Sequence, residues 1–371
     1  MAKQKDHSRV YICHTFYHVY TTFLKEFKLR EAYAKQGIPD DGADLFLSTL
    51  STDFGDLAER IEATGFFRKI YRFEEIRDTA YPELEKWRKD TGSGLKNLLQ
   101  RIRFTSAYAK TVAPHIPTPL EDYGDIYVYC DSDPIGFYLN KYRIPYHAIE
   151  DGLNALVYYD TARFDNRGHF GLKVFFSNRL NLIFIQNGYG KYCIDMEVND
   201  QSLITHPCPK YIDEPREALT DRMTAGEREI LMRALIPDAE RIIGLLRSTK
   251  KEERIIILTE PLCALDVRER IFRDLVEQYQ KEGVVFLKPH PRDELDYKKC
   301  FPEIPQLDAS VPMEMLNYIP EARFRKAISV LTETAAIGFA DEIVKYGADF
   351  MDKYEDPQIH RQNETIGATA F

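Results

Sequence analysis

The sequence lacks the patterns of several common protein classes. No apolar run reaches the length of about 18 residues that a membrane-spanning helix needs, and the polar opening Met1–Asp6 is unlike a signal peptide. The six cysteines are widely spaced and form no C-x-x-C pair, so neither a disulfide framework nor a zinc site is expected. We therefore expect a protein that works in the reducing cytoplasm.

Two nucleotide-binding signatures are missing as well. The chain contains neither G-x-G-x-x-G nor G-x-x-x-x-G-K-[ST], which removes the main support for a dinucleotide-dependent oxidoreductase or a P-loop enzyme. The net charge of −9 argues against a general nucleic-acid binder, because such a protein needs a basic face to neutralise phosphates. Any anionic ligand must therefore meet a local cluster of cations.

The chain does contain a regular alternation of β-rich runs and amphipathic helical stretches. A length of 371 residues suits two domains, and the alternation is typical of parallel sheets built from βαβ units. We predict an α/β fold with two Rossmann-like domains, residues 1–200 and 201–371, and a cleft between them. The expected strands are 9–13, 43–48, 68–73, 125–130, 145–149, 254–258, 284–287 and 327–331, and the later helices are 225–247, interrupted at Pro237, 267–281 and a C-terminal helix over 337–354.

The segment from Lys288 to Asp293 directly follows an apolar strand. The carboxyl ends of strands are where open α/β sheets bind ligands. A proline on each side of His290 fixes the backbone, so the imidazole is presented on a stiff turn. We expect His290 to serve as a general acid or phosphate-binding donor beside Lys288, Pro291 and Arg292. The alternative is a tight connection that carries a surface histidine.

Acidic residues follow the strand 145–149, and glycine supplies the exit from it. Adjacent carboxylates on Glu150 and Asp151 point to opposite sides, so one of them can face the cleft and act as a general base. An acidic turn in which Asp151 caps the next segment is the alternative. Because His290 lies in the other predicted domain, we expect the two motifs to face each other across the cleft.

The sequence Asp131-Ser132-Asp133 looks like the metal-binding D-x-D box of many sugar transferases. We favour a structural reading, because Asp133 precedes Pro134 and a helical run, which is the pattern of an N-cap followed by proline. Asp131 would remain free to contact an acceptor.

The second half offers further polar groups near strand ends. Asp266 follows the strand 254–258 and is either a helix cap or a catalytic carboxylate. Another strand end is surrounded by Ser329, Thr332 and Thr334, and we expect a helix to follow. The hydroxyls and the N–H groups at the N-terminus of that helix would bind an anion. The alternative is that the hydroxyls only cap the helix. Glu314 could accept a hydrogen bond from a ribose hydroxyl, or be a first-turn residue favoured by the helix dipole.

Residues 163–191 combine aromatic and basic side chains. The stretch carries five Arg or Lys residues against one Asp. Such a segment can rest on a membrane surface or hold a lipid-linked acceptor. The alternative is a segment that is half core and half solvated face.

Several of these motifs together resemble bacterial sialyltransferases. Glu150-Asp151-Gly152 matches the D/E-D/E-G motif, Lys288-Pro289-His290-Pro291-Arg292 the HP motif, and the segment from Ser329 to Thr334 the S/T motif. The chain is most similar to the lipooligosaccharide sialyltransferase family, glycosyltransferase family 52, which is related to bacterial polysialyltransferases. The segments 14–18, 258–262 and 312–314 also resemble that family's pattern.

The resemblance implies a GT-B fold, a CMP-sialic acid donor bound by the second domain, inversion at the anomeric carbon, and neither a required metal nor a cofactor. His290 would assist the departure of CMP while the serine and threonine hydroxyls cradle its phosphate. We favour Asp151 as the base and keep Asp266 as the alternative. His14, Asp131 and Glu150 are then expected on the acceptor side of the first domain.

Two other functions share these features. A CDP-polyol phosphate transferase of cell-surface polymer synthesis would also release CMP, and an inactive GT-B module would bind glycan without turnover. For the active enzyme we expect a glycan or lipid-linked glycan acceptor, peripheral contact with the inner face of the membrane through 163–191, and no nucleic acid. A homodimer is left open.

Overall fold

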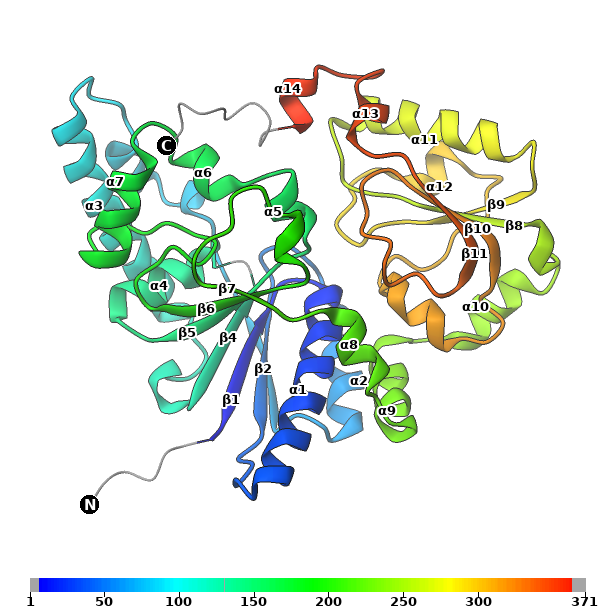
Figure 1. Ribbon diagram of the computed structural model, residues 1–371, viewed down its shortest axis with the longest axis horizontal. Coiled ribbons are helices and arrows are strands. Elements are labelled where there is room, and N and C mark those ends of the chain that lie inside the picture. The colour runs from blue at the N-terminus through cyan, green and yellow to red at the C-terminus, as the bar shows by residue number, and fades with distance from the viewer. Residues whose placement is uncertain (1–6, 130, 362–371) are drawn as a thin grey trace.

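The computed structural model describes residues 7–129 and 131–361, which form two parallel sheets packed among helices (Figure 1). The larger sheet has seven strands in the order β3-β2-β1-β4-β5-β6-β7, and the smaller has four in the order β11-β10-β8-β9. The predicted α/β class is confirmed. The strands are β1 (Arg9–Cys13), β2 (Ala43–Ser48), β3 (Lys69–Phe73), β4 (Asp125–Tyr129), β5 (Tyr146–Ile149), β6 (Cys193–Val198), β7 (Tyr211–Asp213), β8 (Arg254–Leu258), β9 (Val284–Lys288), β10 (Phe324–Ser329) and β11 (Ala340–Lys345).

Helices flank both sheets and connect their strands (Figure 1). They are α1 (Phe16–Gln36), α2 (Leu57–Thr64), α3 (Gly94–Val112), α4 (Pro134–Tyr142), α5 (Asn154–Val157), α6 (Thr161–Asp165), α7 (Phe170–Val174), α8 (Arg216–Asp221), α9 (Ala225–Leu235), α10 (Ala239–Leu246), α11 (Leu265–Tyr279), α12 (Tyr297–Cys300), α13 (Ala348–Met351) and α14 (Pro357–His360), with the short 3₁₀ helix η8 (Met313–Tyr318). Within the described residues, no helix is both long and apolar enough to cross a membrane.

Helix α1 is fixed at both of its ends. The hydroxyl of Thr15 accepts a hydrogen bond from the backbone N–H of His18 at 3.2 Å, which satisfies a donor of the first turn. Gly37 ends the helix with a φ of 65°, a conformation that glycine adopts without strain. His18 is thereby held one turn into α1, next to the carboxyl end of β1.

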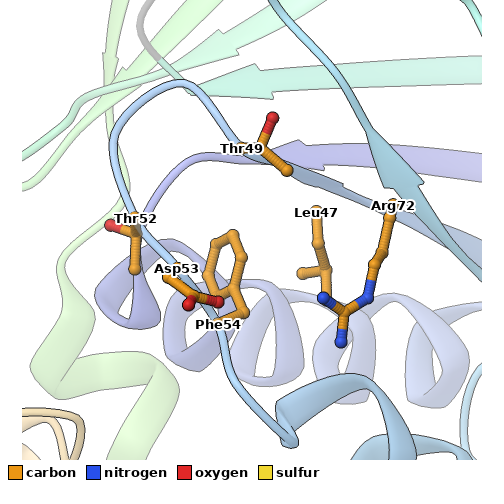
Figure 2. Close-up of a pocket in the computed structure, with 6 residues that line it drawn as sticks. All are labelled: Leu47, Thr49, Thr52, Asp53, Phe54 and Arg72. Carbon is orange, nitrogen blue, oxygen red and sulfur yellow. The ribbon is translucent and has the colours of Figure 1, made fainter.

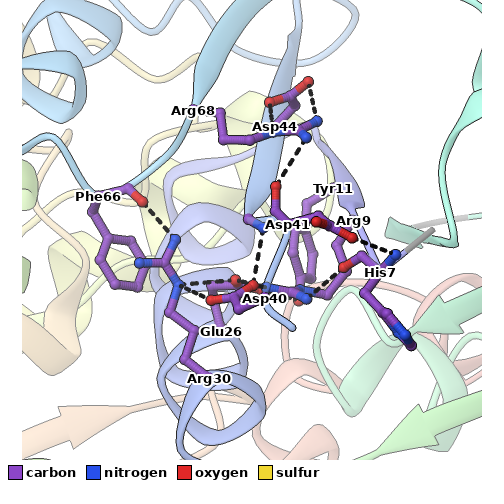
Figure 3. A network of polar contacts seen from close by, with 11 residues as sticks. His7, Arg9, Tyr11, Glu26, Arg30, Asp40, Asp41, Asp44, Phe66 and Arg68 are labelled. Atoms are coloured by element: carbon purple, nitrogen blue, oxygen red, sulfur yellow. Dashed lines mark hydrogen bonds and ion pairs between the residues drawn. The ribbon is translucent and has the colours of Figure 1, made fainter. Parts of the chain in front are cut away.

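A buried ionic network fixes α1 to the opposite, amino-terminal end of the sheet (Figure 3). The fully buried Arg9 donates to Glu26 at 2.6 and 3.0 Å and to Asp40 at 2.5 Å, and the Tyr11 hydroxyl donates to Glu26 at 2.9 Å. Loss of one partner from a buried pair of this kind typically costs about 3–5 kcal/mol. This end of the sheet is therefore structural, and the opposite edge carries the candidate site.

The first sheet extends beyond the predicted domain boundary at residue 200. Strand β7 lies at residues 211–213, and α8 and α9 pack against α1 and α2. The predicted interruption at Pro237 is found between α9 and α10. We therefore propose that the two units divide between α9 and α10, and that residues 201–235 belong to the first.

The predicted C-terminal helix over 337–354 is wrong. Residues 340–345 form β11, which pairs in parallel with β10, and only the short α13 and α14 follow. As an edge strand, β11 keeps several side chains exposed, so its sequence resembles the polar face of a helix. The adjacent β-branched pair Ile343-Val344 fits the pleated sheet. The predicted strand 125–130 reaches Cys130, and the predicted second domain reaches residues 362–371, all of which lie outside the described residues.

Candidate active site

The predicted motifs gather at the carboxyl-terminal edges of the two sheets. All strand pairs in both sheets are parallel, so the loops after β1, β4 and β5 share one edge and the loops after β8, β9 and β10 share the other. The edges touch, because Arg292 Nη1 lies 3.2 Å from Asp151 Oδ2. Asn154 Nδ2 also donates to the carbonyl of Leu331. The two motifs that we expected to face each other are thus in direct contact.

Asp151 is held between the two units. Its Oδ1 accepts a hydrogen bond from His18 Nε2, while Oδ2 pairs with Arg292. The other ring nitrogen of His18 accepts from the backbone N–H of His14 at 3.0 Å, so the ring proton resides on Nε2. Burial lowers the pKa of His18 to about 4, and the ring stacks on Tyr129 at 4.2 Å. His18 is therefore a neutral donor that orients Asp151.

His14, which we expected on the acceptor side, is a buried cation among carboxylates. Its Nε2 lies 2.5 Å from Glu75 Oε2 and 3.5 Å from Asp133 Oδ2. Burial opposes the positive charge, but Glu75 and Asp133 outweigh it and raise the pKa of His14 to about 9. The sequence did not indicate Glu75, whose only signal is its place just after β3.

Asp133 occupies the N-cap position of α4, as predicted, but its side chain makes no capping hydrogen bond. Glu75 supplies the capping acceptor instead, because its Oε1 accepts a hydrogen bond from the backbone N–H of Ile135, in the first turn of α4, at 3.0 Å. Asp133 instead faces His14, and burial raises the pKa of Asp133 to about 7. The predicted capping role of its carboxylate is therefore wrong, and the carboxylate belongs to the His14 cluster.

Asp131 is not free to contact an acceptor, contrary to our expectation. Its buried carboxylate accepts from the backbone N–H groups of Asn187 at 2.6 Å and Gly188 at 3.2 Å, and from the Tyr146 hydroxyl at 3.1 Å. Both oxygen atoms are engaged by the turn at 187–188, where each residue has a positive φ. Asp131 thus stabilises that turn.

Glu150 points away from its neighbour Asp151, as the alternation along an extended chain predicts. Its Oε2 accepts from the backbone N–H of Asn199 at 2.9 Å, and burial raises the pKa of Glu150. The side chain is buried beside β6 and the segment that leads to β7. A direct contact of Glu150 with an acceptor stays a prediction.

His290 stands on the expected turn after β9. The ring Nδ1 accepts from the backbone N–H of Arg292 at 3.1 Å, and the backbone N–H of His290 donates to Thr259 Oγ1 at 3.1 Å. Burial and then the charges of Arg292 and Lys288 lower the pKa of His290 to about 3. The ring is therefore neutral and carries its proton on Nε2, where it can donate a hydrogen bond. Pro291 lies within this turn, which a 3.0 Å bond from Asp293 N–H to the His290 carbonyl closes.

Lys288 and Glu314 lie behind that turn and are both buried. The Lys288 ammonium donates to the carbonyls of Pro289 at 2.9 Å and Ala309 at 3.3 Å, and burial lowers its pKa to about 8. Burial likewise raises the pKa of Glu314 to about 7. Lys288 therefore stabilises the loop that presents His290, and its contact with a donor stays a prediction.

The S/T segment forms a loop, so the predicted helix N-terminus beside it is wrong. Ser329 Oγ donates to Glu260 Oε1 at 3.3 Å, and Glu260 also accepts from the N–H groups of Val330 at 3.1 Å and Leu331 at 2.9 Å. Thr332 lies next in this loop, and the N–H of Thr334 donates to Glu333 at 2.9 Å. Glu260, which belongs to the segment 258–262 that also resembles the family's pattern, organises this loop.

Asp266 is exposed in the first turn of α11, whose N-cap position is Ala264. The helix starts two residues earlier than predicted, so Asp266 does not cap it. A carboxylate in a first turn is favoured by the helix dipole, which accounts for this residue without a catalytic role. Its role as the alternative base stays a prediction.

A cavity of about 130 Å³ lies at the ends of β2 and β3, on the same edge as the Asp151 group (Figure 2). None of the residues that the sequence analysis selected lines it. Figure 2 shows Asp53 and Arg72 directed toward the same space beside the Phe54 ring. The lining residues are Leu47, Thr49, Thr52, Asp53, Phe54 and Arg72.

Comparisons with known proteins identify the family and the fold. The sequence model of glycosyltransferase family 52 matches residues 121–349. An uncharacterized protein of Haemophilus influenzae is 31% identical over 99 residues, which make up 25% of this chain and 31% of that protein. The chain thus spans less than a third of that relative's length.

Two solved bacterial sialyltransferases share the fold. A 2,6-sialyltransferase of Photobacterium sp. JT-ISH-224, solved with the donor product CMP and the acceptor substrate lactose, superposes with a TM-score of 0.53 at 10% identity, covering 91% of this chain and 71% of that one. An α/β-galactoside α-2,3-sialyltransferase of Photobacterium phosphoreum gives 0.51 at 9% identity, covering 92% and 91%. The predicted GT-B class is confirmed, and the family match establishes that this chain belongs to glycosyltransferase family 52.

Proposed function

We propose that this protein is an inverting sialyltransferase, which moves sialic acid from CMP-sialic acid to a hydroxyl group of a glycan and requires no metal ion. The observation that carries the proposal is the contact between Asp151 of the first unit and Arg292 of the second, at 3.2 Å. This contact brings a carboxylate suited to a base beside the turn that bears His290. Membership of the family supports the same reaction.

Asp151 acts as the general base in this proposal. The acceptor hydroxyl loses its proton to the carboxylate while its oxygen forms a bond to the anomeric carbon of the donor. His18 holds Oδ1, so Oδ2 is the oxygen that meets the hydroxyl after Arg292 turns to the donor. Attack from the face opposite the leaving CMP inverts the anomeric carbon.

The second unit assists the leaving group. As the bond between the anomeric carbon and the phosphate oxygen breaks, the phosphate of CMP gains negative charge. The Nε2–H of neutral His290 donates to that oxygen, and the Arg292 guanidinium offsets its charge. A hydroxyl of the S/T segment, that of Thr332 or Thr334, contacts another phosphate oxygen, because Ser329 Oγ is buried and donates to Glu260. With a single phosphate, these donors make a metal dispensable.

The acceptor in this proposal is a lipid-linked glycan of the lipooligosaccharide or capsule type. Between α6 and β6, the apolar side chains of Leu172, Phe175, Leu180 and Leu182 are exposed on a segment rich in Arg and Lys. We propose that they rest on the inner face of the membrane. Sedimentation with anionic vesicles tests this contact, and replacement of Leu172 and Phe175 by Glu should abolish it.

The decisive experiment measures free CMP after incubation with CMP-sialic acid and lactose, with and without EDTA. We expect release that depends on lactose and resists EDTA, and a product of inverted configuration by NMR. Turnover with CDP-glycerol instead of CMP-sialic acid would identify a polyol phosphate transferase. Donor binding without any release would identify an inactive module.

A further inference from the structure

Arg216, the first residue of α8, has a buried guanidinium with unused donors. The residue is only 6% exposed, and its Nη1 donates to the Glu214 carbonyl at 2.7 Å. Its Nε and Nη2 have no carboxylate or carbonyl partner within hydrogen-bonding geometry among the described residues, and the neutral Tyr17 hydroxyl is the side chain that interacts with the guanidinium. A buried charged group that leaves hydrogen-bond donors unsatisfied destabilises the folded protein. Such a group therefore indicates a site where a ligand supplies the missing acceptors.

Arg216 lies close to the segment that carries Glu150 and Asp151. Its backbone N–H donates to Asn199 Oδ1 at 2.8 Å, and the N–H of Asn199 donates to Glu150 Oε2 at 2.9 Å. Glu150 immediately precedes Asp151 in the chain. These bonds connect the backbone of Arg216, at the start of α8, to the end of β5 through Asn199.

Arg216 also borders the nucleotide side of the molecule. Helix α8 lies beside α1, on the side of the first unit that faces the smaller sheet (Figure 1). Tyr17 of α1 is near enough to interact electrostatically both with Arg216 and with Glu314 of η8 in the second unit. Glu150 interacts in the same way with Glu333 of the S/T loop. A donor held by that loop and the His290 turn would bring its sugar close to Arg216.

The surrounding charges do not satisfy the guanidinium. Glu150 and Glu197 are the carboxylates near Arg216, and Glu314 lies on the other side of Tyr17. Within the described residues, none of the three forms an ion pair with Arg216. Glu197 is paired with Lys25 instead. The planar guanidinium fork matches a carboxylate better than any other ligand group.

We propose that Arg216 binds the carboxylate of the sialyl group and so selects CMP-linked sugars that carry an acid. This inference rests on the proposed function and extends it to donor specificity. The guanidinium nitrogens are shielded from solvent in this structure. Donor binding therefore includes a local movement of the groups that cover them.

The test compares two ligands by calorimetry, CMP and a CMP-sialic acid analogue that resists hydrolysis. In Arg216→Leu the affinity for the analogue should fall about 10- to 100-fold, because a charge-assisted pair is lost, while the affinity for CMP changes less than about threefold. Arg216→Lys should recover part of the loss. In wild type, the methyl ester of the analogue should bind as weakly as the acid binds to Arg216→Leu.

Arg163→Leu serves as the matched control, because Arg163 is similarly buried in the same unit but pairs with Asp160 at 3.1 Å. It should leave both affinities at the wild-type level, and thermal melts check that each variant folds. If Arg216→Leu loses affinity for CMP and for the analogue equally, or loses none, the inference about Arg216 is wrong. The proposed sialyl transfer is not affected by that result. A wild-type protein that binds CMP but not the analogue overturns the proposed donor as well.

Discussion

At the residue scale, two histidines of the site have the same hydrogen-bonding arrangement. His18 and His290 each accept a backbone N–H at Nδ1, which leaves the proton on Nε2 and directs that N–H outward. His14 differs, because carboxylates on one side hold it as a cation. The site therefore presents two neutral donors, His18 to Asp151, the proposed base, and His290, the proposed donor to the leaving group.

Removal of the donor to the leaving group should slow the reaction. We predict that His290→Ala lowers kcat by about 10²-fold or more, because the imidazole contributes to the transition state rather than to core packing. Steady-state kinetics check this, with circular dichroism to confirm the fold. A wild-type kcat would remove His290 from the mechanism.

Replacement of the base should separate chemistry from nucleotide binding. Asp151→Asn is expected to abolish transfer yet leave CMP affinity near normal, because the base meets the acceptor. Asp266→Asn, a change at an exposed position, is the matched control and should retain transfer. The reverse pattern in two folded variants would move the base to the second unit.

His18 should set the pH range of the base. The His18 N–H stabilises the ionised form of Asp151, so its loss in His18→Ala raises the pKa of Asp151. We expect the acidic limb of kcat/KM against pH to move upward by about one unit. His18→Gln retains a donor and should restore the wild-type limb. An unchanged profile in His18→Ala would limit this histidine to packing.

At the scale of elements, carboxylates from one loop stabilise the start of another. Glu75, after β3, accepts from the first turn of α4, and Glu260, after β8, accepts from the loop after β10. Glu75 also holds the charge on His14. The stability of these loops is therefore linked to pH.

The linkage predicts a loss of stability in mild alkali. The pKa of His14 is about 9 in the folded protein and near 6.5 when unfolded, so its contribution is complete below pH 6.5 and is lost as pH rises toward 9. Urea denaturation of wild type and His14→Gln should give a difference in unfolding free energy that shrinks over this interval. A constant difference contradicts the assignment of charge to His14.

At the scale of the molecule, the two units are joined by a shared hydrophobic core and by polar contacts at the site. The core includes Leu219 and Met223 of the first unit together with Phe286 and Phe324 of the second. The Asp151–Arg292 pair is partly exposed, and such pairs stabilise proteins by about 0–1 kcal/mol. The core therefore holds the units together, and the ion pair is available to ligands.

Arg292→Ala tests that division of roles. Its unfolding free energy should stay within about 1 kcal/mol of wild type, whereas affinity for CMP should fall by about tenfold or more, because the guanidinium offsets phosphate charge. Urea denaturation and calorimetry measure the two quantities. A large loss of stability with unchanged CMP affinity would make Arg292 a structural link.

The order of strands and helices could be read from the sequence where local signals are strong. The apolar runs that end before Glu150 and at Lys288 are true strands, and His290 does lie in a turn closed by a backbone hydrogen bond. The edge strand at 340–345 was misread as helix because its exposed side chains hide the period of two, and only pairing with β10 makes it a strand.

By itself the sequence determined the α/β class, the family and the two motifs that meet, because these depend on local patterns. Tertiary structure decided what each polar group contacts. The cap of α4 comes from Glu75 rather than the adjacent Asp133, and the partners of Asp151 come from α1 and from the other unit. These partners are far apart along the chain, and no local pattern encodes which distant charges folding brings together in a low dielectric.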